Sequence, residues 1–164
     1  GMTSAIWPSR PLSTGYVRAR SASADDKPAI QPNYLAHEQD QQVTVAALRL
    51  QRKLLRTPEM TPYLDHEVMP GDAVQSDDEL LDFARRYGTT IFHLMGTCRM
   101  GPSAERNSVV SDELKVHGID GLRIADASVM PAMPSANTNA STVMIAEKAA
   151  DMILGKPPLP AAEV

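Results

Sequence analysis

The sequence predicts a chain that combines α-helices with short β-strands. Residues 38–56 indicate a helix, because apolar side chains recur there at spacings of four, three and four. The residues of this apolar stripe are Val43, Ala47, Leu50 and Leu54. Residues 15–22 (GYVRARSA) instead alternate tyrosine and arginine with small apolar residues, which is typical of a strand with one solvated face.

A second helix is predicted to begin at a capping box. Ser76 is followed three residues later by Glu79, so the serine side chain can accept the N–H of Glu79 while the glutamate reaches back. The helix should end near Tyr87, before a glycine. Residues 89–94 (TTIFHL) are β-branched and aromatic, and they predict a strand with His93 at its end.

The last part of the sequence predicts extended segments followed by a third helix. Residues 108–116 indicate an extended segment, and a turn is expected at 117–118. Residues 122–125 predict a short buried strand. A helix from about 140 to 154 should end with Gly155 directly after its last turn.

Composition argues against several classes of partner. The 164 residues carry a net charge of −4, which disfavours nucleic acid because phosphate binding needs clustered lysine and arginine. No apolar run approaches the ~20 residues that span a bilayer, so no membrane is expected, and the first residues do not resemble a secretory signal. A single cysteine, Cys98, excludes an internal disulfide and fits a reducing compartment. These features predict a cytoplasmic protein.

Two segments carry a pattern that favours binding. Residues 92–101 (FHLMGTCRMG) place His93 shortly before a glycine-threonine turn. Residues 122–154 pass from a short apolar strand through a proline-containing loop and an Asn-Thr-Asn cluster into a helix. A loop that delivers polar side chains and free backbone N–H groups to a helix start is suited to an anion or a cofactor.

Both segments resemble the carboxyl-terminal region of glucose–methanol–choline (GMC) oxidoreductases, which use FAD to oxidise alcohols. Residues 10–35, with RP-x-S-x-G leading to PNYL, extend the resemblance to nearly the whole chain. It implies one domain over residues 1–164, with an α+β fold in which helices pack on one face of an antiparallel-rich sheet. The sequence has no GxGxxG, so the Rossmann FAD domain is expected to be lacking.

The resemblance assigns the chemistry to His93 and Asn137. Oxidation of an alcohol by a flavin requires a base for the hydroxyl proton, and histidine suits this task because its ordinary pKa lies near neutral pH. His93 matches the family's histidine in HLMGTCRMG, and Asn137 matches the second position, where the choline-oxidising branch has asparagine. Asparagine donates and accepts hydrogen bonds but is not a base. His93 is therefore the expected acceptor of the hydroxyl proton.

The resemblance also implies FAD-contacting residues. The backbone of Asp126 and Ala127 would lie along the ribityl and pyrophosphate, and Thr138, Asn139 and Ala140 would present N–H groups to the flavin N1/O2 edge. A helix start carries about half a positive charge, which suits the negative charge that develops at that edge. Without a cofactor, Asn139 or Ser141 would serve as the helix N-cap.

The same residues allow other interpretations. An isolated histidine at a strand end is more often satisfied by a backbone carbonyl than active in catalysis. A metal site can be drawn from a histidine, cysteine and aspartate set, but its spacing matches no zinc pattern, so no metal is predicted. The members of that set are His93, Cys98, His117 and Asp126.

The sequence supports two functions. In the first, the chain is the catalytic half of an FAD-dependent alcohol dehydrogenase or oxidase, acts on a small alcohol, and is inactive without a separate FAD-binding chain. In the second, it is a non-catalytic remnant that acts as a binding or interaction domain. In an intact relative residues 122–155 would pack on the FAD domain. Exposed alone they would form an apolar patch, which predicts a homodimer.

Overall fold

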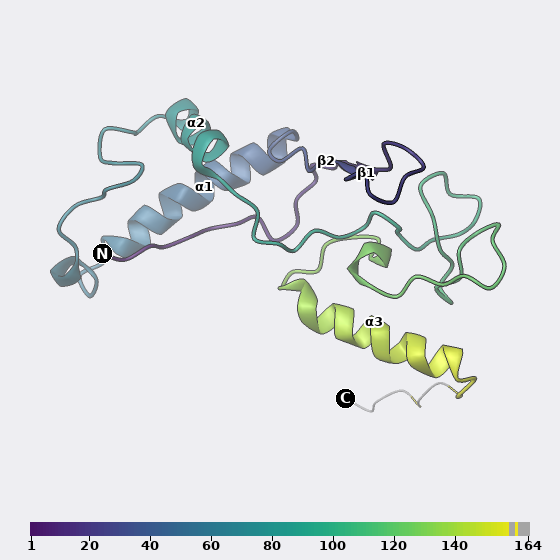
Figure 1. Ribbon diagram of the computed structural model, residues 1–164. Helices are drawn as coiled ribbons and strands as arrows, with labels where there is room; N and C mark the ends of the chain where they lie inside the picture. Colours follow the sequence, from purple (N-terminus) through teal and green to yellow (C-terminus); the bar gives the residue numbers. More distant parts are fainter. Residues whose placement is uncertain (158–159, 161–164) are drawn as a thin grey trace. The chain divides into compact units, whose positions relative to one another are not determined.

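The computed structural model describes residues 1–157 and 160. Its elements, shown in Figure 1, are two strands, three α-helices and two short 3₁₀ turns. In chain order they are β1 (Tyr16–Arg18), β2 (Ala29–Gln31), α1 (Glu38–Leu55), η1 (Thr61–Tyr63), α2 (Asp77–Tyr87), η2 (Ala127–Val129) and α3 (Thr138–Ile153). The chain forms two compact units, Gly1–Ile91 and a second that begins at Phe92. Each is described by itself.

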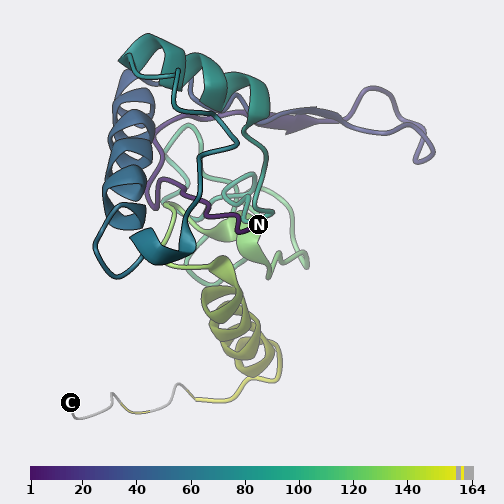
Figure 2. The same cartoon turned by 90° about the vertical axis from the view of Figure 1, so that its left-hand side faces the viewer.

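The first unit contains the sheet, a two-stranded antiparallel hairpin. Tyr16 pairs with Gln31, and Arg18 pairs with Ala29. The strand is shorter than the predicted 15–22, because the chain turns after Arg20 and Ser21 Oγ donates to the carboxylate of Asp26 over 2.6 Å. The hairpin projects away from α1 and α2 (Figure 2).

Gly15 allows the two hairpin strands to meet. A Cβ atom at this position would lie 1.8 Å from the carbonyl oxygen of Gln31 and 2.7 Å from that of Pro32. Both obstacles are backbone atoms, so a side chain could enter only if the strands separated. The glycine is therefore required by the close approach of the backbone.

Both predicted helices of the first unit form. The capping box of α2 is confirmed: the N–H of Glu79 donates to Ser76 Oγ over 3.2 Å, and Glu79 Oε2 accepts the N–H of Ser76 over 2.8 Å. The helix ends at Tyr87, as predicted. α2 packs on α1 and buries Leu80 completely. A local capping signal thus sets the start of α2.

The apolar stripe of α1 does not face the interior of its unit. Val43, Leu50 and Leu54 are 43%, 55% and 58% exposed, whereas the buried residues of α1 are Asp40, Thr44 and Val45. A physical reason is that the carboxylate of Asp40 accepts hydrogen bonds from the segment before β1, which requires that face of the helix to turn inward. The hydrogen bonds of the buried Asp40 carboxylate therefore decide which face of α1 turns inward, and the apolar stripe stays exposed.

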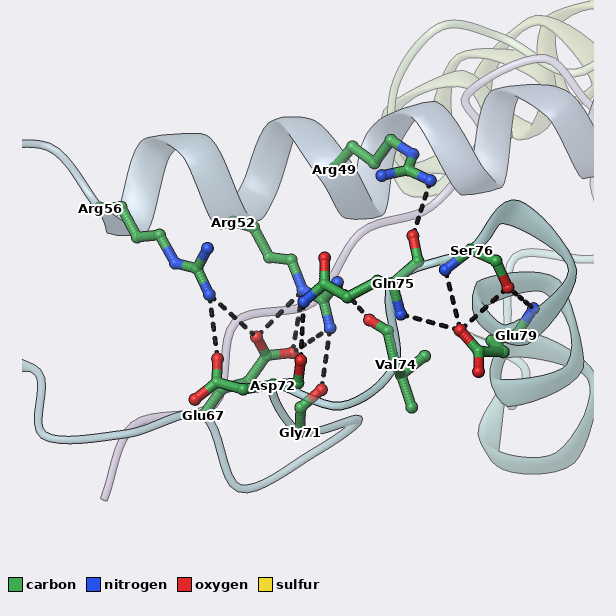
Figure 3. A network of polar contacts seen from close by, with 10 residues as sticks. All are labelled: Arg49, Arg52, Arg56, Glu67, Gly71, Asp72, Val74, Gln75, Ser76 and Glu79. Atoms are coloured by element: carbon green, nitrogen blue, oxygen red, sulfur yellow. Dashed lines mark hydrogen bonds and ion pairs between the residues drawn. The ribbon is translucent and has the colours of Figure 1, made fainter.

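Two arginines of α1 and the arginine at its C-cap, Arg56, bind the loop between α1 and α2, as Figure 3 shows. Arg52 binds both carboxylate oxygens of Glu67 at 2.9–3.1 Å and donates to the carbonyls of Gly71 at 3.2 Å and Val74 at 2.7 Å. Arg49 and Arg56 add ion pairs with Asp77 and Asp72, respectively. The second half of the loop, from Glu67 onward, is thereby attached to the helix.

The second unit has a small apolar core without extended strands. Its buried residues come from the loops before α3 and from α3 itself: Val110, Leu114, Val129, Met130, Ile145 and Ala149. The chain segments around this core exchange single bridges, such as Val110 with Val116 and Lys115 with Arg123. The turn predicted at 117–118 is present, with Gly118 at φ +75°.

Two predicted strands of the second half are wrong. Residues 89–94 form no strand because Phe92 takes a left-handed backbone, with φ +62°, which interrupts extended pairing. Residues 122–125 contribute only the bridge through Arg123. The α+β character is confirmed, but in residues 1–157 and 160 the sheet consists of the hairpin alone, in place of an antiparallel-rich sheet with helices on one face.

The third helix begins earlier than predicted. α3 spans Thr138–Ile153 rather than 140–154, and Asn137 occupies its N-cap position. Gly155 follows its last turn at φ +66° and donates its N–H to the carbonyl of Met152, as expected for a glycine that ends a helix. Over the described residues, none of the helices combines the length and apolarity needed to cross a membrane.

Candidate functional site

The site is built on three segments of the second unit. The first is the loop that follows Phe92, in which His93 is half-buried. The ring nitrogen Nδ1 of His93 lies 3.1 Å from the hydroxyl Oγ1 of Thr138, the first residue of α3. Forty-five positions separate the two residues in the sequence, so this contact joins the histidine motif to the Asn-Thr-Asn cluster.

A ladder of backbone hydrogen bonds holds the histidine loop against the second segment. The N–H groups of Gly96, Cys98 and Met100 donate to the carbonyls of Ala127, Ser128 and Val129 over 3.3, 2.9 and 2.8 Å. Gly96 takes φ +82°, and a Cβ there would lie 3.3 Å from the carbonyl of Met130. The positive φ and the close approach both favour the glycine of the HLMGT motif at this position.

Asp126 uses its carboxylate locally. Oδ1 accepts the N–H of Ser128 over 2.8 Å and so caps η2. The side chain is exposed, and the backbone after it accepts hydrogen bonds from the histidine loop. This arrangement agrees with a turn-forming side chain, while a cofactor contact of the Asp126–Ala127 backbone stays a prediction.

The third segment is the start of α3. The side chain of Asn137 forms no capping hydrogen bond, and the first turn contains no acidic residue. The N–H groups of Thr138, Asn139 and Ala140 have no partner within the helix, as in any first turn. Asn137, Asn139 and Ala140 are exposed, and Thr138 is 7% exposed. The N-terminal end of this sixteen-residue helix has no side-chain cap. It is electropositive and therefore suits an electron-rich group.

The structure places the predicted residues as follows. It brings His93 against Thr138, and Asn137 is the neighbouring residue at the same helix start. It connects the histidine loop to the Asp126–Ala127 turn through the backbone ladder. Asn139, named above as a possible N-cap, lies inside the first turn because Asn137 takes the N-cap position. Ser141 lies deeper still, so neither alternative N-cap is correct.

Sequence reasoning missed the side chain of Thr138. Only its backbone N–H was predicted to matter, yet its hydroxyl is the group that contacts His93. One sequence feature could have drawn attention to this hydroxyl: a threonine stands between two asparagines at a helix start, at a position where an apolar residue would also fit. Sequence alone does not show that the loop 45 residues earlier returns to this point.

The second histidine of this unit has a structural role. His117 Nε2 lies 3.0 Å from both Ser108 Oγ and the carbonyl oxygen of Gly101, and Ser108 Oγ donates to that carbonyl over 2.7 Å. These contacts close the loop between Gly101 and Ser108. In the part of the chain that the structure describes, no three histidine, cysteine or acidic side chains come together as a metal site.

Comparison with known proteins decides the family. The family model of the GMC oxidoreductase carboxyl-terminal region matches residues 11–146, which is most of the chain. The chain belongs to the GMC oxidoreductase family. The match begins before the hairpin and ends inside α3, so it includes all three segments of the site. The resemblance inferred from the sequence motifs is confirmed.

Several GMC relatives are similar over almost the whole chain. The oxygen-dependent choline dehydrogenase of Escherichia coli O157:H7 strain EC4115 is 45% identical over 151 residues, which cover 92% of this chain and 26% of that protein. Pyridoxine 4-oxidase from Mesorbium loti superposes with a TM-score of 0.83 at 31% identity, over 92% of this chain and 29% of that one.

A third relative connects the family to its cofactor. An FAD-dependent oxidoreductase from Chaetomium thermophilum superposes with a TM-score of 0.83 at 32% identity, over 89% of this chain and 25% of that one. The chain thus spans between a quarter and a third of the length of these three relatives.

Proposed function

We propose that this chain is the carboxyl-terminal, substrate-facing part of an FAD-dependent enzyme that oxidises the CH–OH group of a small alcohol. The observation that carries the proposal is the contact between His93 and Thr138, which sets the histidine of the family motif at the electropositive start of α3. A base for the hydroxyl proton and a site for an electron-rich cofactor edge are then adjacent.

The start of α3 fits FAD. Its side-chain cap is missing, its first turn has no acidic residue, and Asn139 and Ala140 are exposed. The N–H groups of residues 138–140 would therefore hold the flavin N1/O2 edge, and the backbone of residues 126–127 would lie along the ribityl and pyrophosphate. Bound FAD would supply hydride acceptance. The protein side chains supply orientation and proton transfer.

His93 is the proposed base and Asn137 its partner at the substrate oxygen. The ring of His93 is fixed through Nδ1, so Nε2 is the nitrogen left for the hydroxyl proton. The exposed amide of Asn137 at the neighbouring helix start would hold the same oxygen and orient the C–H bond, because positioning contributes a large part of such a reaction. Asparagine cannot take the proton itself.

The substrate we propose is a choline-like small alcohol. Choline dehydrogenases are among the chain's relatives, and Asn137 is the residue type that the family resemblance implies for the choline-oxidising branch. The rest of the pocket, including contacts to a cationic head group, would come from other parts of the protein. These would be supplied by the same polypeptide in a longer form or by a separate FAD-binding chain.

In the assembled enzyme we propose that residues 1–164 act as one carboxyl-terminal domain and that residues 122–155 pack on the FAD-binding domain. Support comes from the outward apolar side chains of α3. Those that face solvent here are Val143, Met144, Ala146, Ala150 and Ile153. The same helix uses Ile145 and Ala149 for the core of its own unit, so it has two apolar faces.

The test is activity after an FAD-binding portion is supplied. We expect the purified 164-residue chain to be colourless alone, because it has no GxGxxG, and to oxidise choline once the FAD-binding portion of a relative is joined to it. His93→Ala should then lower kcat by about a hundredfold or more, the scale for loss of a general base. Asn137→Ala should lower it less.

His66→Ala is the matched control, because His66 is exposed in the first unit and contacts only its neighbour Asp65 among the polar contacts described. Full turnover of the His93→Ala enzyme at neutral pH would show that His93 is not the base. No oxidation of any small alcohol by the joined wild-type protein, with FAD bound, would favour the non-catalytic interaction domain instead.

A further inference from the structure

We propose that Thr138 is a positioning residue whose hydroxyl selects the ring tautomer of His93. The inference rests on the proposed function only in taking Nε2 of His93 as the proton acceptor. It uses a side chain that the family assignment does not require, because the N–H group of Thr138, rather than its hydroxyl, is the predicted cofactor contact.

The geometry gives Thr138 a fixed hydroxyl. It is 7% exposed and is the first residue of α3. Its carbonyl accepts the N–H of the following helical turn and, in addition, the hydroxyl of Thr142 over 2.8 Å. The helical bond alone holds the backbone that carries Oγ1. In a helix the χ1 angle of threonine is restricted to two main rotamers, so Oγ1 has few positions available to it. The helix and the burial of Thr138 therefore help to hold the 3.1 Å contact between Thr138 Oγ1 and His93 Nδ1.

The chemistry of the two groups determines what the contact does. A neutral imidazole carries its hydrogen on one nitrogen, and the hydrogen bond made by the other nitrogen decides which. If Nδ1–H donates to Thr138 Oγ1, the lone pair is on Nε2, which can accept a proton. If the hydroxyl donates to Nδ1, Nε2 carries the hydrogen and cannot act as a base.

Only the first arrangement survives proton transfer without rearrangement. When Nε2 takes a proton, both ring nitrogens become donors, and Thr138 Oγ1 still accepts from Nδ1. The hydroxyl oxygen therefore accepts the same hydrogen bond from Nδ1 before and after the proton transfer. We therefore infer that Thr138 takes the acceptor role, in which Oγ1 accepts the Nδ1–H hydrogen bond and Nε2 stays available for the proton.

The direct test is the ring tautomer of His93, read from its ¹⁵N chemical shifts in the purified chain. We expect the wild-type ring to be mainly in the Nδ1–H form. Thr138→Val removes the hydroxyl at nearly constant volume and should shift the ring toward the Nε2–H form. Thr138→Ser keeps the hydroxyl and should restore the wild-type signature.

Thr142→Val is the matched control. It makes the same chemical change one turn later and removes a hydrogen bond to the backbone of Thr138, but not the hydroxyl that faces His93. We expect it to leave the tautomer unchanged. A wild-type ring in the Nε2–H form would overturn the proposal, as would a Thr138→Val ring that keeps the wild-type signature. The wild-type measurement decides even if Thr138→Val does not fold.

Turnover supplies a second, separable readout. In the protein joined to an FAD-binding portion, Thr138→Val should lower kcat by about tenfold with KM nearly unchanged, since one hydrogen bond to the base is lost and no substrate contact is removed. A tautomer shift in Thr138→Val combined with full activity of His93→Ala would confirm that Thr138 selects the tautomer and would refute His93 as the base. The two proposals can therefore fail independently.

Discussion

At the scale of single residues, Asp40 is a buried carboxylate that accepts several hydrogen bonds. It is 3% exposed, and its carboxylate accepts the N–H groups of Leu12 and Ser13 and the hydroxyl of Ser13 at 2.5–3.1 Å. Burial alone would raise the pKa of Asp40. The hydrogen bonds from Ser13 and Leu12 outweigh burial, and the pKa of Asp40 lies below its ordinary value.

Replacing Asp40 by Asn should destabilise the chain by about 1–3 kcal/mol at pH 7, because an amide cannot accept all the donors that point at it. A lowered pKa means that the folded state holds the ionised form more strongly than the unfolded state. That stability is complete above the unfolded pKa of about 4 and is lost as pH falls through the lower folded value.

Urea unfolding of the wild type and Asp40→Asn at several pH values measures both effects. The variant should lose part of the acid-induced decrease in the free energy of unfolding. Asp25→Asn, at an exposed position in the hairpin turn, should leave both the stability and its pH dependence nearly unchanged. Equal curves for Asp40→Asn and the wild type would show that the carboxylate contributes nothing.

At the scale of elements, α1 is anchored by arginines of unequal exposure. The side chains of Arg52 and Glu67 are 12% and 21% exposed, whereas those of Arg49 and Asp77 are 47% and 73% exposed. Ion pairs in water contribute little, since solvent screens them and two long side chains must be ordered. The inner pair, with its added bonds to two carbonyls, should therefore contribute more.

Arg52→Lys should lower the free energy of unfolding by about 1–3 kcal/mol, since lysine keeps the charge but cannot bind a carboxylate and two carbonyls at once. Arg49→Lys makes the same exchange at the exposed pair and should change it by less than about 1 kcal/mol. Denaturant unfolding of the two variants side by side measures the difference. Equal losses would contradict the view that the inner arginine fastens the loop.

The elements that could be predicted are those with a local cause. The capping box of α2 lies within four residues, and the glycine after α3 acts on the helix that precedes it, so both were correct. The predicted strand at 89–94 depended on β-propensity alone, which the left-handed backbone of Phe92 overrides. Phe92 is 86% exposed. Its apolar side chain therefore gives no packing signal from which the left-handed backbone could be predicted.

The candidate site was predictable in its residues and not in its geometry. His93 and Asn137 could be named because short motifs surround them. The contact with Thr138 depends on a loop that returns over 45 positions, and the register of that return is set by backbone bonds between residues 96–100 and 127–129. Backbone bonds of this kind leave no side-chain signature in a sequence.

At the scale of the whole molecule, several apolar side chains of the second unit are exposed, and a large exposed apolar surface is uncommon on a soluble monomer. On α3 they are the outward residues named above, and Leu122 and Ile119 are exposed as well. In the proposed enzyme this surface packs on the FAD-binding domain. Without that domain, another apolar surface should cover it.

We expect the isolated chain to form a symmetric dimer through residues 122–125 and α3, since self-association in a closed pair is the commonest solution. Light scattering at micromolar concentration should return twice the mass of one chain, and Met144→Glu should shift it toward the monomer. Glu147→Gln, on the same helix at an exposed polar position, is the control. A monomer mass with α3 protected from hydrogen exchange would contradict the dimer.

Gly15 limits how the gene for this protein can vary. Alanine is the smallest replacement that a codon change can introduce, and its single methyl group would already stand 1.8 Å from the carbonyl oxygen of Gln31. The Cβ atom of any replacement residue would collide with backbone atoms. Rotating the new side chain, or a neighbouring one, therefore cannot relieve the clash. Variation at position 15 would require the partner strand to move as well, so a tolerated replacement should arise only together with a change in the opposite arm of the hairpin.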